Sequence, residues 1–196
     1  MNRLRSLLLA MLAILALAAV SSTTASAFTE FTAANGTLLA TKGGPQEFSA
    51  TAGVTITTKC AAMSAIGEVA LLKTEVEQER TEFSGCKTAG LASTVSNGCN
   101  FTYNIDGLVD FGTVPNCKLL VEISVTKCKI EYTGVESFLK EAGYGNFESN
   151  KFETKSTIGG IKFESATGKN CGFKEAAVKG RATWTGSSVS VGSNVK

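Results

Sequence analysis

The sequence contains no histidine and only two aspartates among its 196 residues. Without histidine, the Ser-His-Asp and Cys-His nucleophile systems, imidazole acid–base catalysis and histidine-ligated zinc or copper are excluded. The aspartates, Asp106 and Asp110, belong to no D-x-[DN]-x-[DN]-G loop, which argues against calcium. The net charge of +2 is too balanced to attract nucleic acid or an anionic membrane. We therefore expect no catalytic residue, no metal, no cofactor and no nucleic-acid partner.

The first 27 residues have the composition of a secretory signal peptide. Two arginines precede an apolar run over 7–20, and the segment ends in Ala25-Ser26-Ala27. This order of charged, apolar and small residues predicts export, with cleavage after Ala27. The 14-residue apolar run is shorter than the ~20 residues that span a bilayer. We expect a secreted, extracellular protein with no stable membrane insertion after cleavage.

Residues 28–196 form the predicted mature chain, which we interpret as one domain. Loss of the two signal arginines leaves 17 basic and 17 acidic residues. All 20 glycines lie in this part, with many serines and threonines and no long stretch of helical period. This composition favours short strands and turns. We predict an all-β fold, a disulfide-stapled two-layer β-sandwich or flattened barrel built from hairpins.

Six cysteines follow the signal segment: Cys60, Cys86, Cys99, Cys117, Cys128 and Cys171. An even number of cysteines in an exported chain indicates three disulfides. The alternative, a metal site, is not favoured because no two cysteines are closer than 11 positions and the C-x-x-C knuckle is absent.

Residues 99–105 alternate apolar and polar side chains and are the clearest predicted strand. Asp106-Gly107 follows, which indicates a hairpin. A three-residue turn at 106–108 would pair Tyr103 with Phe111 and keep the large apolar groups on one face, so we prefer it to a two-residue turn.

Residues 151–165 form a second predicted hairpin, with Gly159-Gly160 as its turn. In this register apolar side chains face one another on one side. Lys155 and Glu164 are then cross-strand neighbours on the other side.

Further strands are predicted at 38–41, 54–60, 74–83, 91–95, 119–125, 128–132 and 182–191. The apolar positions change parity near Thr126, which requires a bulge or a tight turn there. A short helical turn is predicted at 135–142. Residues 61–80 fit either a helix or a hairpin, and Gly67 and the flanking segments favour the hairpin.

The predicted hairpins also indicate how the cysteines pair. A hairpin over 54–83 places Cys60 near Cys86, and the register of the 99–113 hairpin places Cys99 one diagonal step from Cys117. Elimination leaves Cys128 with Cys171. The main alternative joins Cys86 to Cys99.

Two aromatic residues are candidate binding residues. Tyr144 lies in Gly-Tyr-Gly and Trp184 in Thr-Trp-Thr-Gly, and each is a possible exposed platform for a sugar or a peptide. The competing interpretation is that such residues cap a core.

Carboxylates offer two weaker candidates. Glu75, Glu77 and Glu79 would share one face of a strand and suit calcium or a basic partner, although a solvated strand face that discourages edge pairing is the interpretation we favour. Asp110 and Glu122 are a conceivable pair for glycoside hydrolysis, but nothing in the sequence shows that they converge.

Several short segments resemble a group of uncharacterised six-cysteine secreted proteins of soil actinobacteria: Phe31-Thr32, Asn35-Gly36-Thr37-Leu38, Ala52-Gly53-Val54, Phe83-Ser84-Gly85-Cys86, Asn97-Gly98-Cys99-Asn100-Phe101 and the stretch from Cys171 to Trp184-Thr185-Gly186. The resemblance implies an exported, β-rich, cysteine-stapled domain and an actinobacterial host, with no established activity. An immunoglobulin domain is not indicated, because the single tryptophan follows the last cysteine.

These observations predict a secreted, non-enzymatic extracellular or cell-envelope protein that binds an unknown ligand or partner. The alternatives are a carboxylate-dependent glycoside hydrolase and a self-associating surface subunit. A hydrolase requires a cleft with two acids about 5–10 Å apart, whereas a binding protein would expose an apolar or aromatic patch.

Overall fold

The computed structural model describes residues 30–34, 36–72, 75–105, 109–111, 117–133, 143–145 and 151–192. Within these ranges the chain is all-β. The strands are β1 (Leu38–Ala52), β2 (Val54–Cys60), β3 (Ala62–Val69), β4 (Glu75–Ser84), β5 (Lys87–Thr88), β6 (Leu91–Asn97), β7 (Phe101–Asn104), β8 (Val109–Phe111), β9 (Lys118–Ile123), β10 (Cys128–Thr133), β11 (Gly143–Gly145), β12 (Lys151–Ser165) and β13 (Val178–Val191), with a short 3-10 helix, η1 (Gly168–Cys171). None of the described helical segments is long and apolar enough to cross a membrane.

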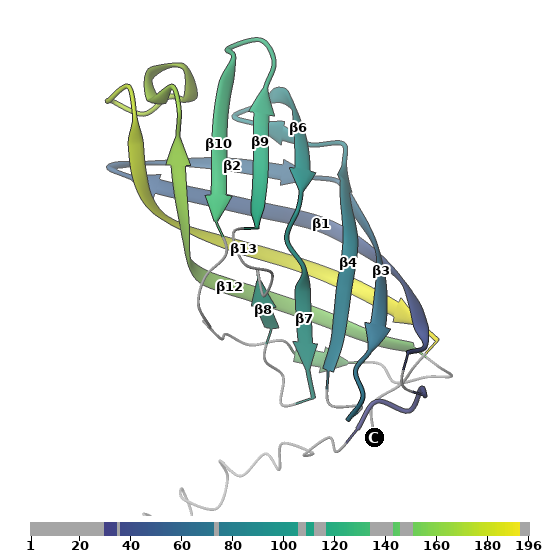
Figure 1. Ribbon diagram of the computed structural model, residues 1–196. Helices are drawn as coiled ribbons and strands as arrows, with labels where there is room; N and C mark the ends of the chain where they lie inside the picture. The colour runs from purple at the N-terminus through teal and green to yellow at the C-terminus, as the bar shows by residue number, and fades with distance from the viewer. Residues whose placement is uncertain are drawn as a thin grey trace, which may run out of the picture.

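Eight of the strands close into an antiparallel barrel (Figure 1). Around the ring the order is β1, β13, β12, β10, β9, β6, β5 and β2, and β2 returns to pair with β1. The all-β prediction is confirmed. Closure of the ring pairs the strands on both sides, so the barrel has no open edge.

A side sheet branches from the barrel at β1. The second half of β1 pairs with β2, whereas its first half pairs with β3. A bulge between Gly43 and Gln46 separates the two halves and contains Pro45, which has no backbone N–H to donate. The sheet continues from β3 through β4 and β7 to β8. The long strands β1, β12 and β13 therefore run along the barrel and on past it (Figure 1).

Strand alternation places the aromatic side chains in one continuous core. Inward residues Phe48, Tyr132 and Trp184 are all 1% exposed. Successive ring pairs link Phe173 to Phe163, Tyr132, Phe48, Phe83, Phe101 and Trp184, with centroid separations from 4.8 to 6.4 Å. A smaller apolar cluster consists of Leu39 of β1, Val69 of β3 and Val76 of β4 together with Phe31.

Three disulfides join the strands, in the pairing predicted from the sequence. Cys60–Cys86 links the end of β2 to the start of β5, Cys99–Cys117 links the segments before β7 and β9, and Cys128–Cys171 ties β10 to η1. Each bridge closes a loop of the chain, so each restricts the unfolded chain.

The predicted hairpin at Gly159-Gly160 is wrong. Residues 151–165 form the single strand β12, which pairs with β13 along nearly its whole length. The glycines form a bulge in that ladder, and Gly160 has a φ of 75°, which favours glycine. Lys155 pairs with Ser187, and Glu164 pairs with Lys179. Lys155 and Glu164 are nine positions apart along one extended strand, which separates them by about 30 Å, so they are not cross-strand neighbours.

The register of the β7–β8 hairpin also differs from the prediction. Tyr103 pairs with Val109 and Phe101 with Phe111, two residues from the expected register. A two-residue slip keeps the same side chains on the core face, and it brings the rings of Phe101 and Phe111 to 5.0 Å. The three-residue turn at 106–108 is therefore too short, although 106–108 lie outside the described residues.

Other strand predictions are confirmed. Residues 61–80 contain the β3–β4 hairpin and no helix in their described part, and the parity change near Thr126 falls in the turn between β9 and β10. The helical turn predicted at 135–142 and the signal segment at 1–27 lie outside the described residues, so both stay predictions.

Candidate functional site

Trp184 is a core residue. Its side chain is 1% exposed and its ring lies 4.8 Å from that of Phe101, so the core interpretation is confirmed and Trp184 is not an exposed platform. The backbone of Tyr144 lies in β11 and pairs with Thr154 of β12. The binding role of Tyr144 stays a prediction.

Beyond the aromatic core, the inward faces of β1, β12 and β13 turn polar. Thr41 and Ser190 share a hydrogen bond of 2.9 Å, and Gln78 Nε2 of β4 donates to Thr41 Oγ1 at 3.0 Å. Thr154 and Ser188 share a second bond of 2.8 Å, and both bond the Tyr103 hydroxyl. These side chains are buried and bond one another inside the fold, and only Gln78 Oε1 among them has no described hydrogen-bond partner. They therefore offer no surface to a partner.

Burial changes the chemistry of two tyrosines in this interior. It raises the pKa of Tyr103 from 10.0 to about 12, against the opposing effect of the hydrogen bonds to Ser188 and Thr154. Burial also raises the pKa of Tyr132 above its ordinary value. Neither phenol is an acid or base at neutral pH, so neither supports proton-transfer chemistry.

One end of the outer surface carries an exposed apolar patch. Val191 of β13, Ala40 of β1 and Ile66 of β3 form one row across three strands, because Ala40 pairs with both neighbours. Val191 is 47% exposed, Ile66 43% and Leu38, two residues from Ala40 on the same face, 67%. We call these four residues the apolar face. Leu71 and Leu72, in the connection that follows β3, are also exposed.

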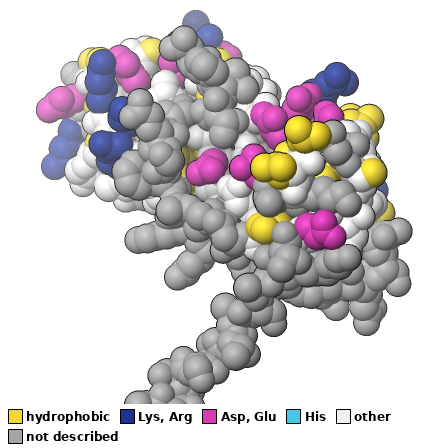
Figure 2. Space-filling view, turned by 60° about the horizontal axis from the view of Figure 1, so that its bottom comes forward, with side chains coloured by type: hydrophobic (Ala, Val, Ile, Leu, Met, Phe, Trp, Pro, Cys, Tyr) yellow, Lys and Arg dark blue, Asp and Glu magenta, His cyan; other side chains and the backbone are white. Residues whose placement is uncertain are grey.

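Glutamates border the apolar face. Ile66 pairs with Glu79 of β4, and Leu38 pairs with Glu68, which pairs in turn with Glu77. We call Glu68, Glu75, Glu77 and Glu79 the acidic border. No lysine or arginine among the described residues forms an ion pair with these carboxylates. Figure 2 shows hydrophobic side chains beside acidic ones on one side of the molecule, with most lysines and arginines in that view on the other.

At Glu77 the acidic border is not explained by protection of an edge. The sequence interpretation assumed an edge strand, but residues 76–78 of β4 pair with β3 on one side and with β7 on the other, whereas Glu75 pairs with β7 alone and Glu79 with β3 alone. Like charges at Glu68 and Glu77 face each other directly, which opposes pairing. At two other places on the sheet a cross-strand lysine neutralises the glutamate: Lys118 pairs with Glu131 at 2.8 Å, and Lys179 pairs with Glu164 at 3.2 Å. The acidic border is therefore a group of negative charges without a described cationic partner.

The carboxylates considered for hydrolysis have separate partners. Glu122 of β9 pairs with Lys129 at 3.7 Å, and Asp110 of β8 accepts a hydrogen bond from Asn104 Nδ2 at 3.3 Å. Within the described ranges, no group of three or more acidic or cysteine side chains is arranged to hold a metal ion.

Comparison with known proteins gives no relative: no family model, no curated protein and no solved structure matches this chain. The resemblance to secreted actinobacterial proteins stays a prediction. The residues of the apolar face were not predicted from the sequence, because they are distant along the chain and meet only through the pairing of β1 with β3 and β13.

Proposed function

We propose that this protein is a secreted, non-enzymatic binding protein whose apolar face docks a partner segment that carries apolar and basic side chains. The observation that carries the proposal is the contiguous row of Val191, Ala40 and Ile66, exposed across three strands and ending at Glu79. Exposed aliphatic patches with a polar rim are typical of interaction surfaces.

Charge complementarity defines the partner's chemistry. Apolar groups on the partner would cover Leu38, Ile66 and Val191, and lysine or arginine would neutralise the acidic border. Uncompensated carboxylates next to the contact also raise the association rate of a cationic partner. Three disulfides support an extracellular location, since such bonds persist in oxidising compartments. The separate partners of Asp110 and Glu122 give no support to the alternative of a hydrolase.

The test uses three synthetic octapeptides as probes: alternating Leu-Lys, alternating Leu-Glu and alternating Ser-Lys. We expect the Leu-Lys peptide to bind, with an affinity that falls as salt increases, and the other two to bind at least about tenfold more weakly. Equal binding of Leu-Lys and Ser-Lys would contradict a role for the apolar face.

Matched variants locate the contact. The triple variant Leu38→Thr, Ile66→Thr and Val191→Thr keeps strand-forming side chains but removes apolar surface, so we expect about tenfold weaker binding. Val125→Thr is the control, because Val125 is 77% exposed in the β9–β10 turn, away from the face. Equal weakening by both variants would overturn the proposal. A dimer would also overturn it if the triple variant abolished dimer formation and the dimer blocked peptide binding. The apolar face would then be the contact with a second copy of the chain.

A further inference from the structure

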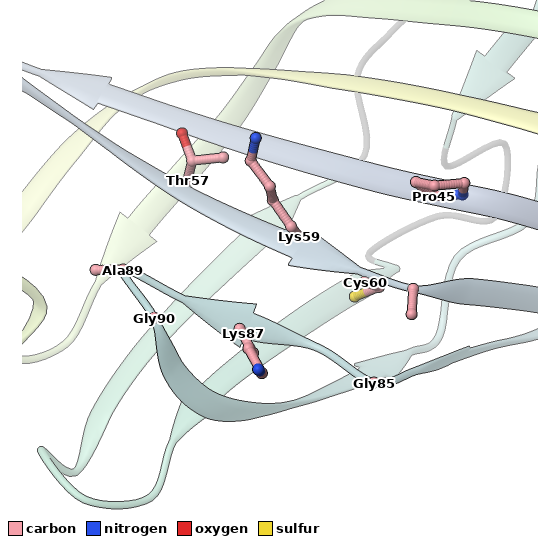
Figure 3. Close-up of a pocket in the computed structure, with 9 residues that line it drawn as sticks. Pro45, Thr57, Lys59, Cys60, Gly85, Lys87, Ala89 and Gly90 are labelled. Atoms are coloured by element: carbon pink, nitrogen blue, oxygen red, sulfur yellow. The ribbon is translucent and has the colours of Figure 1, made fainter.

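A shallow hollow of about 560 Å³ opens on the outer surface beside the Cys60–Cys86 disulfide (Figure 3). It lies where β2 ends and β5 runs alongside, and β1 is the one strand of the apolar face that lines it, through Pro45. Pro45, from the bulge in β1, Ala61, from the β2–β3 connection, and Ala89 and Gly90, from the β5–β6 turn, contribute its walls. Apolar atoms therefore make up most of the lining.

Two lysines lie at the hollow and differ in their partners. Lys59 and Lys87 are directly opposite each other in the β2–β5 ladder. The ammonium of Lys59 pairs with Glu47 Oε2 at 3.0 Å, and Figure 3 shows its side chain directed toward β1. Lys87 points the other way and forms no ion pair with any described residue. The hollow thus has one uncompensated positive charge at its border, beside a second positive charge that is already neutralised.

The β5–β6 turn, which forms one wall of the hollow, has an alanine in a left-handed backbone conformation that a residue with a Cβ disfavours. Thr88 pairs with Leu91, so Ala89 and Gly90 are the two central residues of the β5–β6 hairpin, with φ values of 48° and 84°. Asn, Asp or Gly usually occupies the first central position of such a turn. This chain places an alanine methyl there, which adds an apolar group to the hollow where a polar side chain is usual.

We propose that this hollow binds a small organic anion that has one carboxylate and a short aliphatic body. The aliphatic body would cover the apolar lining formed by Pro45, Ala61 and Ala89. The carboxylate would pair with Lys87, because Glu47 already neutralises Lys59. The site is independent of the apolar face, so either proposal stands if the other fails.

The test is an NMR titration of the 15N-labelled, disulfide-bonded protein with pentanoate, with pentanol and pentylammonium as comparison probes. We expect pentanoate to shift the backbone amides of Lys87, Ala89 and Gly90 in a saturable way. Pentanol, which lacks the charge, and pentylammonium, which has the wrong one, should bind more weakly. Shifts of equal size and affinity with all three probes, or no saturable shift with pentanoate, would overturn the proposal.

Two variants separate the contribution of charge from that of the wall. Lys87→Gln should weaken pentanoate binding about two- to fivefold, as expected for loss of one exposed ion pair, whereas Lys162→Gln, on the outer face of β12, should not change it. Ala89→Asn suits the turn and should fold normally, yet it should weaken binding of pentanoate by replacing the methyl with an amide. Unchanged affinity in both Lys87→Gln and Ala89→Asn would place any binding elsewhere.

Discussion

Ala89 is in a left-handed conformation that its side chain disfavours, so replacing it should stabilise the protein. Its φ is 48°, and the residue is exposed, so the methyl group contributes little buried area. A left-handed conformation costs an L-residue with a Cβ roughly 1–2 kcal/mol, and asparagine is among the residues that tolerate it best. We expect Ala89→Asn to raise the free energy of unfolding by about 0.5–1 kcal/mol, which corresponds to about 1–4 °C in melting temperature for a domain of this size.

The measurement is urea unfolding of the oxidised protein, followed by tryptophan fluorescence because the only tryptophan, Trp184, is buried in the core. Ala92→Asn makes the same change three residues later, in the exposed part of β6, where asparagine is a poor strand former and should destabilise slightly. If Ala89→Asn lowered stability as much as Ala92→Asn does, the turn would not have the strained conformation from which the prediction starts.

Three other predictions concern stability. Replacing Cys128 and Cys171 by alanine removes the bond that spans 43 positions and should lower the free energy of unfolding by about 4 kcal/mol. The same change at Cys99 and Cys117, 18 positions apart, should lower it by about 3 kcal/mol. A loss below about 1 kcal/mol in urea unfolding would contradict both predictions. The pKa of Tyr103 is raised to about 12, so the folded state holds this proton more tightly than the unfolded chain does. Its contribution to stability is complete below pH 10 and falls as the pH rises from 10 to 12; Tyr103→Phe should show a shallower fall in urea midpoint over that window, and parallel curves would refute the assignment. The Ser156 hydroxyl is buried without a described hydrogen-bond partner, so Ser156→Ala should leave the free energy of unfolding unchanged or raise it by up to about 1 kcal/mol. Thr154→Val leaves Ser188 and Tyr103 short of a partner and should lower the free energy of unfolding by about 1–3 kcal/mol in the same assay. A larger loss in Ser156→Ala than in Thr154→Val would be inconsistent with this network.

The sequence was sufficient where a local pattern has one structural outcome. Alternation alone located β2, β4 and β6, and the parity change near Thr126 required the turn between β9 and β10. The predicted cysteine pairing is correct, but two of its premises are not. β2 pairs with β1 and β5 and is not an arm of the hairpin with β4, and the β7–β8 register differs by two residues.

Local patterns failed where they had two outcomes. Gly159-Gly160 suits a tight turn and a bulge equally well. The bulge forms because residues of β13 pair with β12 on both sides of the glycines. The β7–β8 register failed for a related reason, since a slip of two residues leaves every side chain on its face.

The candidate surfaces were the least predictable part of the molecule. Leu38, Ile66 and Val191 are scattered along the sequence, and no periodicity relates them. For Trp184, the sequence offered both a core and an exposed position, because composition does not distinguish a core aromatic from an exposed one. The exposure of Trp184 and the assembly of the apolar face both depend on pairings between strands that are far apart in the chain.

The position of β13 in the ring constrains how the chain acquires its shape. Among the described strands, β13 lies between β1 and β12 and pairs with both, whereas β1 and β12 do not pair directly. Until residues 178–191 have been synthesised, those two strands have nothing to close against. A chain truncated before Val178 would leave two long unpaired edges, which are templates for aggregation. Residues 178–191 therefore complete the ring, and we expect a chain that stops before them to aggregate instead of forming a smaller barrel.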